Sequence, residues 1–492
     1  MSGRQGPQSP LPPTCRATRE FSFRPRIINP VKIRKVVLFA ADEEVRGAGA
    51  ALRDRMPWID IIAPTNPLAA SSLTCNEACA FVLDDTAITL VQPEAIRKNN
   101  ADAVIVLLSA NPLVQCSPPP VALAKFPYTA RADLVFATSR KEFAAARVIP
   151  AAVRAAEDRL NIQKYKRVRR FIFLIVDDEP RWFSQFLPVL YGIIGQRADV
   201  MVTRTYEETL SFLFGVDADT GIDVTRYLQQ GHGDDVVCLI TDIFFPKGSA
   251  LNSDAGRDLI KLVRKYYPRY PIIVASKAKE ALELGNDVLL MPKGDPGSLD
   301  RLRDYILNFT GLGDFLIRDA SGAELHRVKT IHEMYRILEK AERDDAEGVA
   351  LRALLEPYGE NDHFSTWLYM HSYRELGDSL RPKRARGPSM VRVLKRHLKR
   401  EILRMQYTPL MIDGTKVFNL GDLLNALRAA DPATIQPLAD NDIISSWLDR
   451  KGYPELAEEL RPIHGSGARM VHEATQCVEK WMSIYEREGQ SP

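Results

Sequence analysis

The segment FIFLIVDDEP at residues 171–180 decides the fold, because six apolar residues run directly into three acids and a proline. A short, continuous apolar run of this kind is typical of a strand buried in a parallel sheet. The run stops at Asp177, Asp178 and Glu179. Binding sites of open α/β sheets form at the carboxyl ends of the strands, so we expect these acids to face a site.

The same pattern of an apolar run ending on a polar residue recurs three times further along the chain. VVCLITDIFFPKG places Asp242 after a second strand, YPIIVASK reaches Ser276, and DVLLMPKGD reaches Lys293. Between them, AGRDLIKLVRKYYP has the i, i+3, i+4 apolar spacing of an amphipathic helix. A doubly wound parallel sheet would bring all four strand ends to one edge.

These strand ends share a chemistry. Asp177 or Asp178, together with Asp242, offers the oxygen ligands that a hard cation such as Mg²⁺ prefers. With a metal neutralising charge, Asp242 can attack a phosphorylated donor in line and form an acyl phosphate. Lys293 would offset the charge of the transferred group, and the Ser276 hydroxyl would hydrogen-bond one of its oxygens.

Residues 168–312 therefore resemble the receiver domain of two-component response regulators. The matching motifs are VDD at 176–178, TDIFFP at 241–246, Ser276 and Lys293. The resemblance implies that Asp177 and Asp178 bind Mg²⁺, that Asp242 is phosphorylated, and that the backbone carbonyl of Phe244 completes the metal shell. Two positions depart from the receiver pattern: Gly294 follows the lysine, and Leu290 stands where receivers usually carry a switch aromatic.

The 492 residues are too many for one hydrophobic core. We predict an α/β protein with tandem doubly wound, flavodoxin-like, receiver-type domains, followed by two α+β, mainly helical repeats. The predicted units are a disordered Pro-rich tail (1–30), a degenerate receiver-like domain (31–162), the receiver (168–312), and repeats at 313–402 and 403–487.

In the degenerate domain, we expect Ser109, at the end of AVIVLL, to occupy the place of the phosphoacceptor aspartate. This domain would then be unable to accept a phosphoryl group by the usual route. Asp42, Glu43 and Glu44 follow its first predicted strand, and we interpret them as solvated loop acids. Binding a partner is the expected role of this domain.

The C-terminal third contains an internal repeat. NDHFSTWLYMHSYRELGDSLRP at 361–382 and NDIISSWLDRKGYPELAEELRP at 441–462 align without gaps, and the matched pairs include Asn361 with Asn441, Trp367 with Trp447, Tyr373 with Tyr453 and Arg381 with Arg461. A hairpin-like stretch and an amphipathic helix precede each copy. Neither copy has a cluster of acids, His or Cys suited to catalysis. The run GDFLIRDASG, with NDHFSTWL and the Leu-Arg-Pro ending, resembles the regulatory region upstream of phosphoenolpyruvate/pyruvate-binding modules in some bacterial proteins.

Composition limits the remaining function classes. The net charge of +3 predicts no general attraction to nucleic acid, although 381–400 contains nine Lys or Arg and no acid. A solvated helix face is the favoured interpretation of that run. Six scattered cysteines indicate a reducing compartment, and Cys75 and Cys79 lack the partners of a zinc site. No apolar run is long enough to span a membrane, so we expect a cytoplasmic protein.

The leading hypothesis is a bacterial signalling protein that accepts a phosphoryl group on Asp242. It is not expected to be an enzyme, apart from promoting its own phosphorylation and dephosphorylation. The donor would be a sensor histidine kinase or a phosphotransfer protein, and the repeats would bind an unidentified downstream protein; pairing into a homodimer is left open. One alternative is a scaffold that uses its receiver folds for docking without phosphorylation. A nucleic-acid-binding effector acting through 381–400 ranks last.

Overall fold

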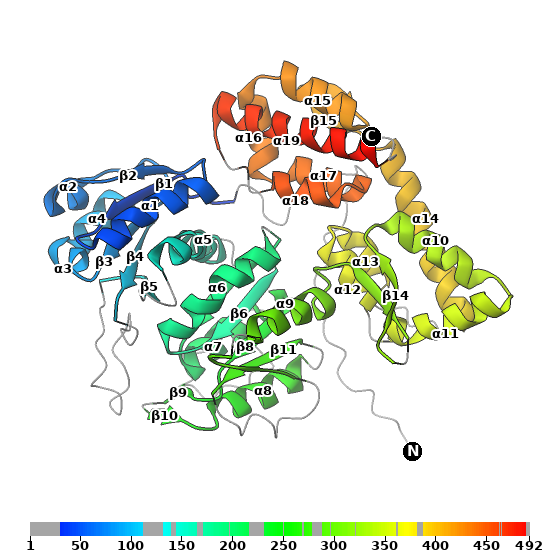
Figure 1. The fold of residues 1–492 in the computed structure, drawn as a ribbon, viewed down its shortest axis with the longest axis horizontal. Helices are drawn as coiled ribbons and strands as arrows, with labels where there is room; N and C mark the ends of the chain where they lie inside the picture. Colours follow the sequence, from blue (N-terminus) through cyan, green and yellow to red (C-terminus); the bar gives the residue numbers. More distant parts are fainter. Residues whose placement is uncertain are drawn as a thin grey trace.

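The structure is a computed structural model. It describes residues 30–111, 131–138, 144–164, 171–195, 197–215, 231–248, 250–267, 270–277, 288–295, 297–319, 321–360, 363–380, 387–461, 463 and 465–488. Two α/β units and two mainly helical units surround a common junction (Figure 1). Of the predicted tail, residues 1–29 lie outside the described residues.

The first unit is built on a five-stranded, all-parallel sheet with the strand order β2-β1-β3-β4-β5. Its strands are β1 (Lys35–Phe39), β2 (Asp60–Ile62), β3 (Cys79–Asp84), β4 (Ala103–Ser109) and β5 (Leu134–Ala137). Its first helices are α1 (Glu43–Arg55), α2 (Pro67–Ser72), α3 (Ala87–Leu90) and α4 (Pro93–Asn99). Both faces of the sheet are covered, which explains why β3 and β4 consist almost wholly of apolar residues.

The second unit repeats this plan with the order β12-β11-β8-β6-β7. Its strands are β6 (Ile172–Val176), β7 (Asp199–Thr203), β8 (Val236–Thr241), β11 (Ile272–Ser276) and β12 (Leu289–Pro292), and its helices are α6 (Pro180–Ile194), α7 (Tyr206–Phe214), α8 (Ala255–Tyr266) and α9 (Ser298–Phe309). Numbered within each unit, both sheets have the order 2-1-3-4-5 of flavodoxin-like folds. The predicted fold class is confirmed. A small hairpin, β9 (Phe245–Lys247) with β10 (Ala250–Asn252), was not predicted.

Helix α5 (Ala145–Lys164) joins the two α/β units into one body. Apolar residues of both sheets and of α5 belong to a single hydrophobic cluster. Within this contact Asp158 pairs with Arg154 at 3.0 Å, and it accepts hydrogen bonds from the Tyr191 hydroxyl at 2.9 Å and the Val200 amide at 2.8 Å. Every polar group brought into the core by α5 in this contact therefore has a partner, as burial requires.

The C-terminal third forms two units of the same design, each a two-stranded hairpin followed by helices. The first contains β13 (Phe315–Arg318), β14 (Glu324–Val328), α10 (Ile331–Glu342), α11 (Ala346–Glu360), α12 (His363–Met370), α13 (Arg374–Leu380) and α14 (Gly387–Tyr407). The second contains β15 (Leu410–Ile412), β16 (Thr415–Val417), α15 (Leu420–Ala429), α16 (Pro432–Asp440), α17 (Ile443–Lys451), α18 (Pro454–Leu460) and α19 (Gly467–Arg487). Trp367 and Trp447, a matched pair of the repeat, are buried in the two cores.

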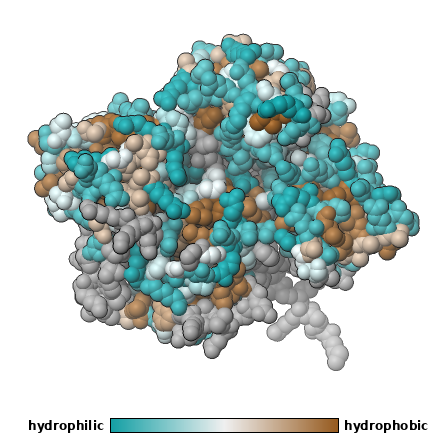
Figure 2. Space-filling model, in the orientation of Figure 1, coloured by the Kyte–Doolittle hydropathy of each residue, from teal (hydrophilic) through white to brown (hydrophobic). Residues whose placement is uncertain are grey.

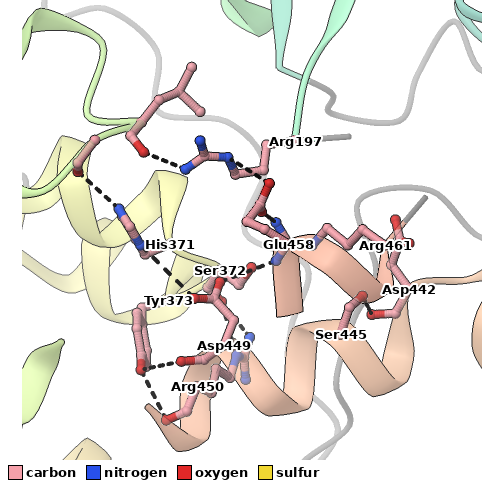
Figure 3. Close-up of polar contacts among 12 residues, drawn as sticks. Arg197, His371, Ser372, Tyr373, Asp442, Ser445, Asp449, Arg450, Glu458 and Arg461 are labelled. Carbon is pink, nitrogen blue, oxygen red and sulfur yellow. Dashed lines mark hydrogen bonds and ion pairs between the residues drawn. The ribbon is translucent and has the colours of Figure 1, made fainter. Parts of the chain in front are cut away.

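The repeats meet at the turn between α12 and α13 (Figure 3). The Arg450 guanidinium donates hydrogen bonds to the Ser372 carbonyl at 2.6 and 3.0 Å, and the Tyr373 hydroxyl donates to the Arg450 carbonyl at 3.0 Å. Ser372 has a φ of 67°, in the left-handed region, and its equivalent Gly452 has a φ of 96°. The turn therefore has a left-handed residue at the same position in both repeats. In the second repeat this residue is a glycine, whereas in the first repeat it is a serine, for which the conformation is less favourable.

Contacts between the units close a ring. The Phe171 ring of the second unit packs edge-on against Tyr369 of the first repeat, with centroids 5.1 Å apart. The second repeat returns to the first α/β unit, where Arg34 forms an ion pair with Asp440 at 2.7 Å and Arg469 donates to a backbone carbonyl at 2.7 Å. The second repeat also contacts the second α/β unit, because Arg197 forms an ion pair with Glu458 at 3.4 Å, so the four units are packed around a common centre (Figure 1).

The prediction that Ser109 replaces the phosphoacceptor is wrong. Asp84 ends β3 and lies opposite Leu108, the residue before Ser109. In the second unit Thr241 pairs with Val274, so Asp242 lies opposite Ala275, the residue before Ser276. Asp84 thus corresponds to Asp242, and Ser109 corresponds to Ser276. The error arose because β3 was not recognised in the sequence.

The first unit nevertheless lacks the other groups of a receiver site. By the strand register, Ala40 and Ala41 take the places of Asp177 and Asp178. The Thr138 amide donates a hydrogen bond to the Ser109 carbonyl at 2.7 Å, just as the Lys293 amide of the second unit donates to the Ser276 carbonyl. Thr138 therefore takes the place of Lys293. The first unit therefore lacks, at this edge of its sheet, the acids and the amine that the second unit carries.

The acids after β1 belong to helix α1. Asp42 caps α1, accepting hydrogen bonds from the Glu44 and Val45 amides, and Glu43 and Glu44 lie in its first turn. The interpretation of these acids as loop residues is therefore wrong, and their charges stabilise the positive end of the helix. Among the described residues, no helix combines the length and apolar character needed to cross a membrane. Cys75 and Cys79 are buried and free.

Candidate receiver site

The second sheet brings the predicted site residues together at one edge. Asp177 and Asp178 follow β6, Asp242 follows β8, Ser276 ends β11, and Lys293 follows β12. The chain order reverses between β6 and β8, which is where open α/β sheets form their binding crevice. The Asp242 amide donates to the carbonyl at the end of β6 at 2.9 Å, and the Lys293 amide donates to the Ser276 carbonyl at 3.1 Å. The backbone therefore fixes the relative positions of the side chains.

The ammonium group of Lys293 is the centre of the site. Its Nζ lies 2.7 Å from Asp177 Oδ2 and is in direct contact with Asp242 Oδ2. The Lys293 side chain is only 3% exposed. Burial opposes its charge, but the two carboxylates raise the pKa of Lys293 above its ordinary value. Lys293 is consequently a buried cation held between two carboxylates from different strands.

The carboxylates outnumber this cation. Burial raises the pKa of Asp177 to about 6. Burial, followed by the nearby charges of Asp177 and Glu179, raises the pKa of Asp178 to about 7. Asp177 Oδ1 accepts a hydrogen bond from the Glu179 amide at 3.0 Å, whereas Oδ2 has only the Lys293 contact within the described chain. The buried carboxylates are therefore only partly neutralised by Lys293, and a second cation bound beside them would stabilise their charged forms.

Asp242 is held in a closely packed loop. It is 9% exposed, and its Oδ1 accepts a hydrogen bond from the Ile243 amide at 2.6 Å. Gly256, in the first turn of α8, lies so close that a Cβ atom there would come within 2.3 Å of the Asp242 carbonyl oxygen and 2.7 Å of Ile243 Cα. A side chain at Gly256 would force the loop that carries Asp242 to move.

The donor set suits Mg²⁺, although it is not a preassembled metal site. Within the described residues, no three His, Cys, Asp or Glu side chains converge as a metal cluster. Mg²⁺ keeps several waters and needs only one or two carboxylates from the protein. Asp177 or Asp178, Asp242 and the carbonyl of Phe244, in the loop between β8 and β9, offer the hard oxygen ligands required. Ser276 is 5% exposed at the same edge.

Sequence analysis missed Trp182, an aromatic residue at this site. The indole N–H of Trp182 donates to Glu179, and its ring lies 5.5 Å from Lys293 Nζ and 4.7 Å from Lys277 Nζ. Burial opposes the Glu179 charge, but hydrogen bonding to Arg181 and its charge lower the Glu179 pKa overall. Trp182 lies in the first turn of α6, directly after the three acids, and this position in the sequence was the signal that could have placed it at the site.

Comparisons with known proteins add little to this geometry. No family model matches the sequence, and no curated protein matches it. Two solved structures described as two-component system response regulator/GGDEF domain proteins match at 14% and 15% identity, each over 56% of this chain and 98% of the other, with TM-scores of 0.24 and 0.22. A third, described as a sugar binding protein from Salmonella typhimurium LT2, matches at 10% identity over 56% of this chain and 86% of the other, with a TM-score of 0.19. The fold assignment rests on the two sheets themselves.

Proposed function

We propose that residues 168–312 are a receiver that accepts a phosphoryl group on Asp242, and that the C-terminal repeats pass the signal on by binding another protein. One observation carries this proposal: a buried lysine from β12 lies between carboxylates from β6 and β8. Such a group offsets negative charge that arrives in a dry crevice, where electrostatic interactions are strongest.

In the proposed reaction a carboxylate oxygen of Asp242 attacks the phosphorus of the donor. The new O–P bond makes an acyl phosphate, and the bond between phosphorus and the leaving group breaks. Lys293 would contact a phosphoryl oxygen, and the Ser276 hydroxyl would donate a hydrogen bond to another. Bound Mg²⁺, held by Asp177 or Asp178 with Asp242 and the Phe244 carbonyl, would neutralise charge on the transferred group. The donor, a sensor histidine kinase or phosphotransfer protein, would act in trans in a bacterial two-component pathway.

Incubation with acetyl phosphate and Mg²⁺ tests the proposal. We expect one hydroxylamine-labile phosphoryl group on the full chain, detected by intact mass and mapped to Asp242. The Asp242→Asn variant should lose the label. Asp300→Asn, which changes an exposed acid on α9, should keep it. An unlabelled wild-type protein, under conditions that label a known receiver, would contradict the proposal.

A scaffold without phosphorylation is the second candidate. The first unit supports it, because Asp84 there is engaged by the Ala87 and Asp42 amides at 2.6 and 2.5 Å and serves the local structure. The Leu290 departure in the second unit favours the same alternative. If the chain is a scaffold, Asp242→Asn will leave partner binding unchanged in the presence of acetyl phosphate and Mg²⁺.

A further inference from the structure

Helix α14 carries an exposed stripe that the proposed function does not explain. The stripe consists of Arg392, Arg396, Lys399, Leu403 and Tyr407, which are spaced three or four residues apart and are all exposed. Residues at this spacing lie along one face of a helix. At about 1.5 Å per residue the stripe is about 22 Å long.

The opposite face of α14 holds the two repeats together. Leu394 and Leu398 lie in the core of the first repeat, and Met405 lies in the core of the second. Cations beside the stripe have acidic partners: Lys395 pairs with Glu342 at 2.6 Å, and Arg404 with Glu375 at 3.1 Å. The helix is thus anchored on one side, and its side chains flanking the stripe are already paired.

The cations of the stripe itself are available. Arg392, Arg396, Lys399 and the adjacent Arg400 form no ion pair with any described part of the chain. Since only the flanking cations meet acids of their own molecule, the stripe presents uncompensated positive charge. This arrangement fits a negatively charged partner.

The carboxyl-terminal half of the stripe is apolar. Leu403 is 45% exposed and Tyr407 is 73% exposed. The chain continues into the β15–β16 hairpin, where Met411 and Phe418 are 47% and 42% exposed. The face seen in Figure 2 is largely hydrophilic and carries several separate hydrophobic patches. Arg, Tyr, Phe and Met are the residue types enriched in protein–protein interfaces.

We infer that α14 and the β15–β16 hairpin form the docking surface for an acidic amphipathic helix of a partner protein. The partner helix would lie along α14, with Asp or Glu side chains against the cations and apolar side chains against Leu403 and Tyr407. This inference deepens, and rests on, the proposed output role of the repeats.

The stripe has its cations at one end and its apolar residues at the other, and this order favours a helical partner over a nucleic acid or a lipid surface. A phosphate backbone would contact the cations and leave the apolar half without a partner. A lipid surface favours apolar residues that insert with cations around them, whereas here the two kinds follow one another along the helix axis. A second helix lying along α14 can place acidic side chains against the cations and apolar side chains against Leu403 and Tyr407 at the same time.

Fluorescence anisotropy with full-length protein tests the inference. The probe is a labelled peptide of about 18 residues, long enough to form a helix, with Glu in one half of its contact face and Leu and Phe in the other. Arg396→Glu/Lys399→Glu/Arg400→Glu should weaken binding by about tenfold or more, because three attractions become repulsions. Leu403→Ser/Tyr407→Ser should weaken it as well. Lys261→Glu, an exposed lysine on α8, is the control and should leave binding unchanged.

Three comparison probes complete the experiment: the same peptide with Lys in place of Glu, duplex DNA, and vesicles of phosphatidylcholine and phosphatidylglycerol. Equal binding of the charge-reversed peptide, or stronger binding of DNA or vesicles, would overturn the inference. So would an unchanged affinity of the triple variant. Labelling of Asp242 by acetyl phosphate is measured on the same variants, so that failure of the receiver proposal and failure of the docking surface are seen separately.

Discussion

Replacing Lys293 with methionine removes the buried cation of the candidate site and nearly preserves the side-chain length. Asp177 and Asp242 would then face each other without compensation. Removing one partner of a buried ion pair costs about 3–5 kcal/mol. Asp177 can limit this cost by taking up a proton. Burial raises the pKa of Asp177 to about 6 in the wild type although Lys293 lowers it, so removing Lys293 raises this pKa further. Protonation at pH 8 therefore costs less than it would from a pKa of about 6, at 1.36 kcal/mol per pH unit, and we expect a loss of no more than about 3 kcal/mol at that pH.

The same reasoning fixes the pH dependence of the variant. At pH 6 protonation of Asp177 costs almost nothing, so the loss in Lys293→Met should shrink to below about 1 kcal/mol. A chain of several units does not unfold in one step. Hydrogen–deuterium exchange of β6 and β8, measured by mass spectrometry, therefore gives the local opening free energy at both pH values. Mg²⁺ should restore part of the stability at pH 8.

Lys277→Met provides the matched control, because Lys277 lies at the same site but its side chain is 54% exposed. Its removal should cost no more than about 0.5 kcal/mol. Combining Lys293→Met with Asp242→Asn should cost less than Lys293→Met alone, since the uncompensated charge is reduced. Equal losses at pH 6 and pH 8 would show that Lys293 acts through packing, and the electrostatic account of the site would fail.

Three further predictions concern the acceptor loop and the junction between the repeats. Gly256→Ala should slow labelling of Asp242 by acetyl phosphate at least about tenfold, because the added Cβ displaces the loop; unchanged labelling would show that the loop tolerates it. Burial lowers the pKa of His371, so below its unfolded pKa of about 6.5 the unfolded chain binds a proton that the folded chain refuses. The stability of wild type relative to His371→Gln should therefore fall from pH 7 to pH 5, measured by hydrogen–deuterium exchange of α12, and the same difference in opening free energy at both pH values would contradict this. Ser372→Gly should preserve or raise the opening free energy of α12 by up to about 1 kcal/mol, whereas Ser372→Val should lower it by more than about 1 kcal/mol, since only the glycine adopts a φ of 67° without strain; equal exchange in the two variants would refute the strain argument.

The second α/β unit could be predicted because its central strands, β6 and β8, are apolar runs that end on acids. β6 and β8 have no interruption by small residues, and α8 has a regular apolar stripe. β3 was missed because CAFVLD has few β-branched residues and follows a polar stretch. That omission shifted the assignment of the first unit by one strand, from Asp84 to Ser109.

The candidate site was predicted as a set of residues, but its internal arrangement was not. Strand order alone brings Asp177, Asp242 and Lys293 to one edge. It does not determine that the lysine occupies the space between the two carboxylates, because that depends on side-chain packing in three dimensions. Trp182 was overlooked for the same reason, because only the three-dimensional geometry shows its ring beside two lysines.

The return of the second repeat to the first α/β unit has a mechanical consequence. A row of modules linked only in sequence can bend at any single hinge. Here the Arg34–Asp440 ion pair is one of the contacts that make the four bodies a closed linkage, so no hinge can rotate unless others rotate with it. A small rearrangement beside Asp242 would then be felt at other joints. Uncoupling the second repeat from the α/β units would require breaking at least the Arg34–Asp440 pair, the hydrogen bond from Arg469 to the Pro57 carbonyl and the Arg197–Glu458 pair.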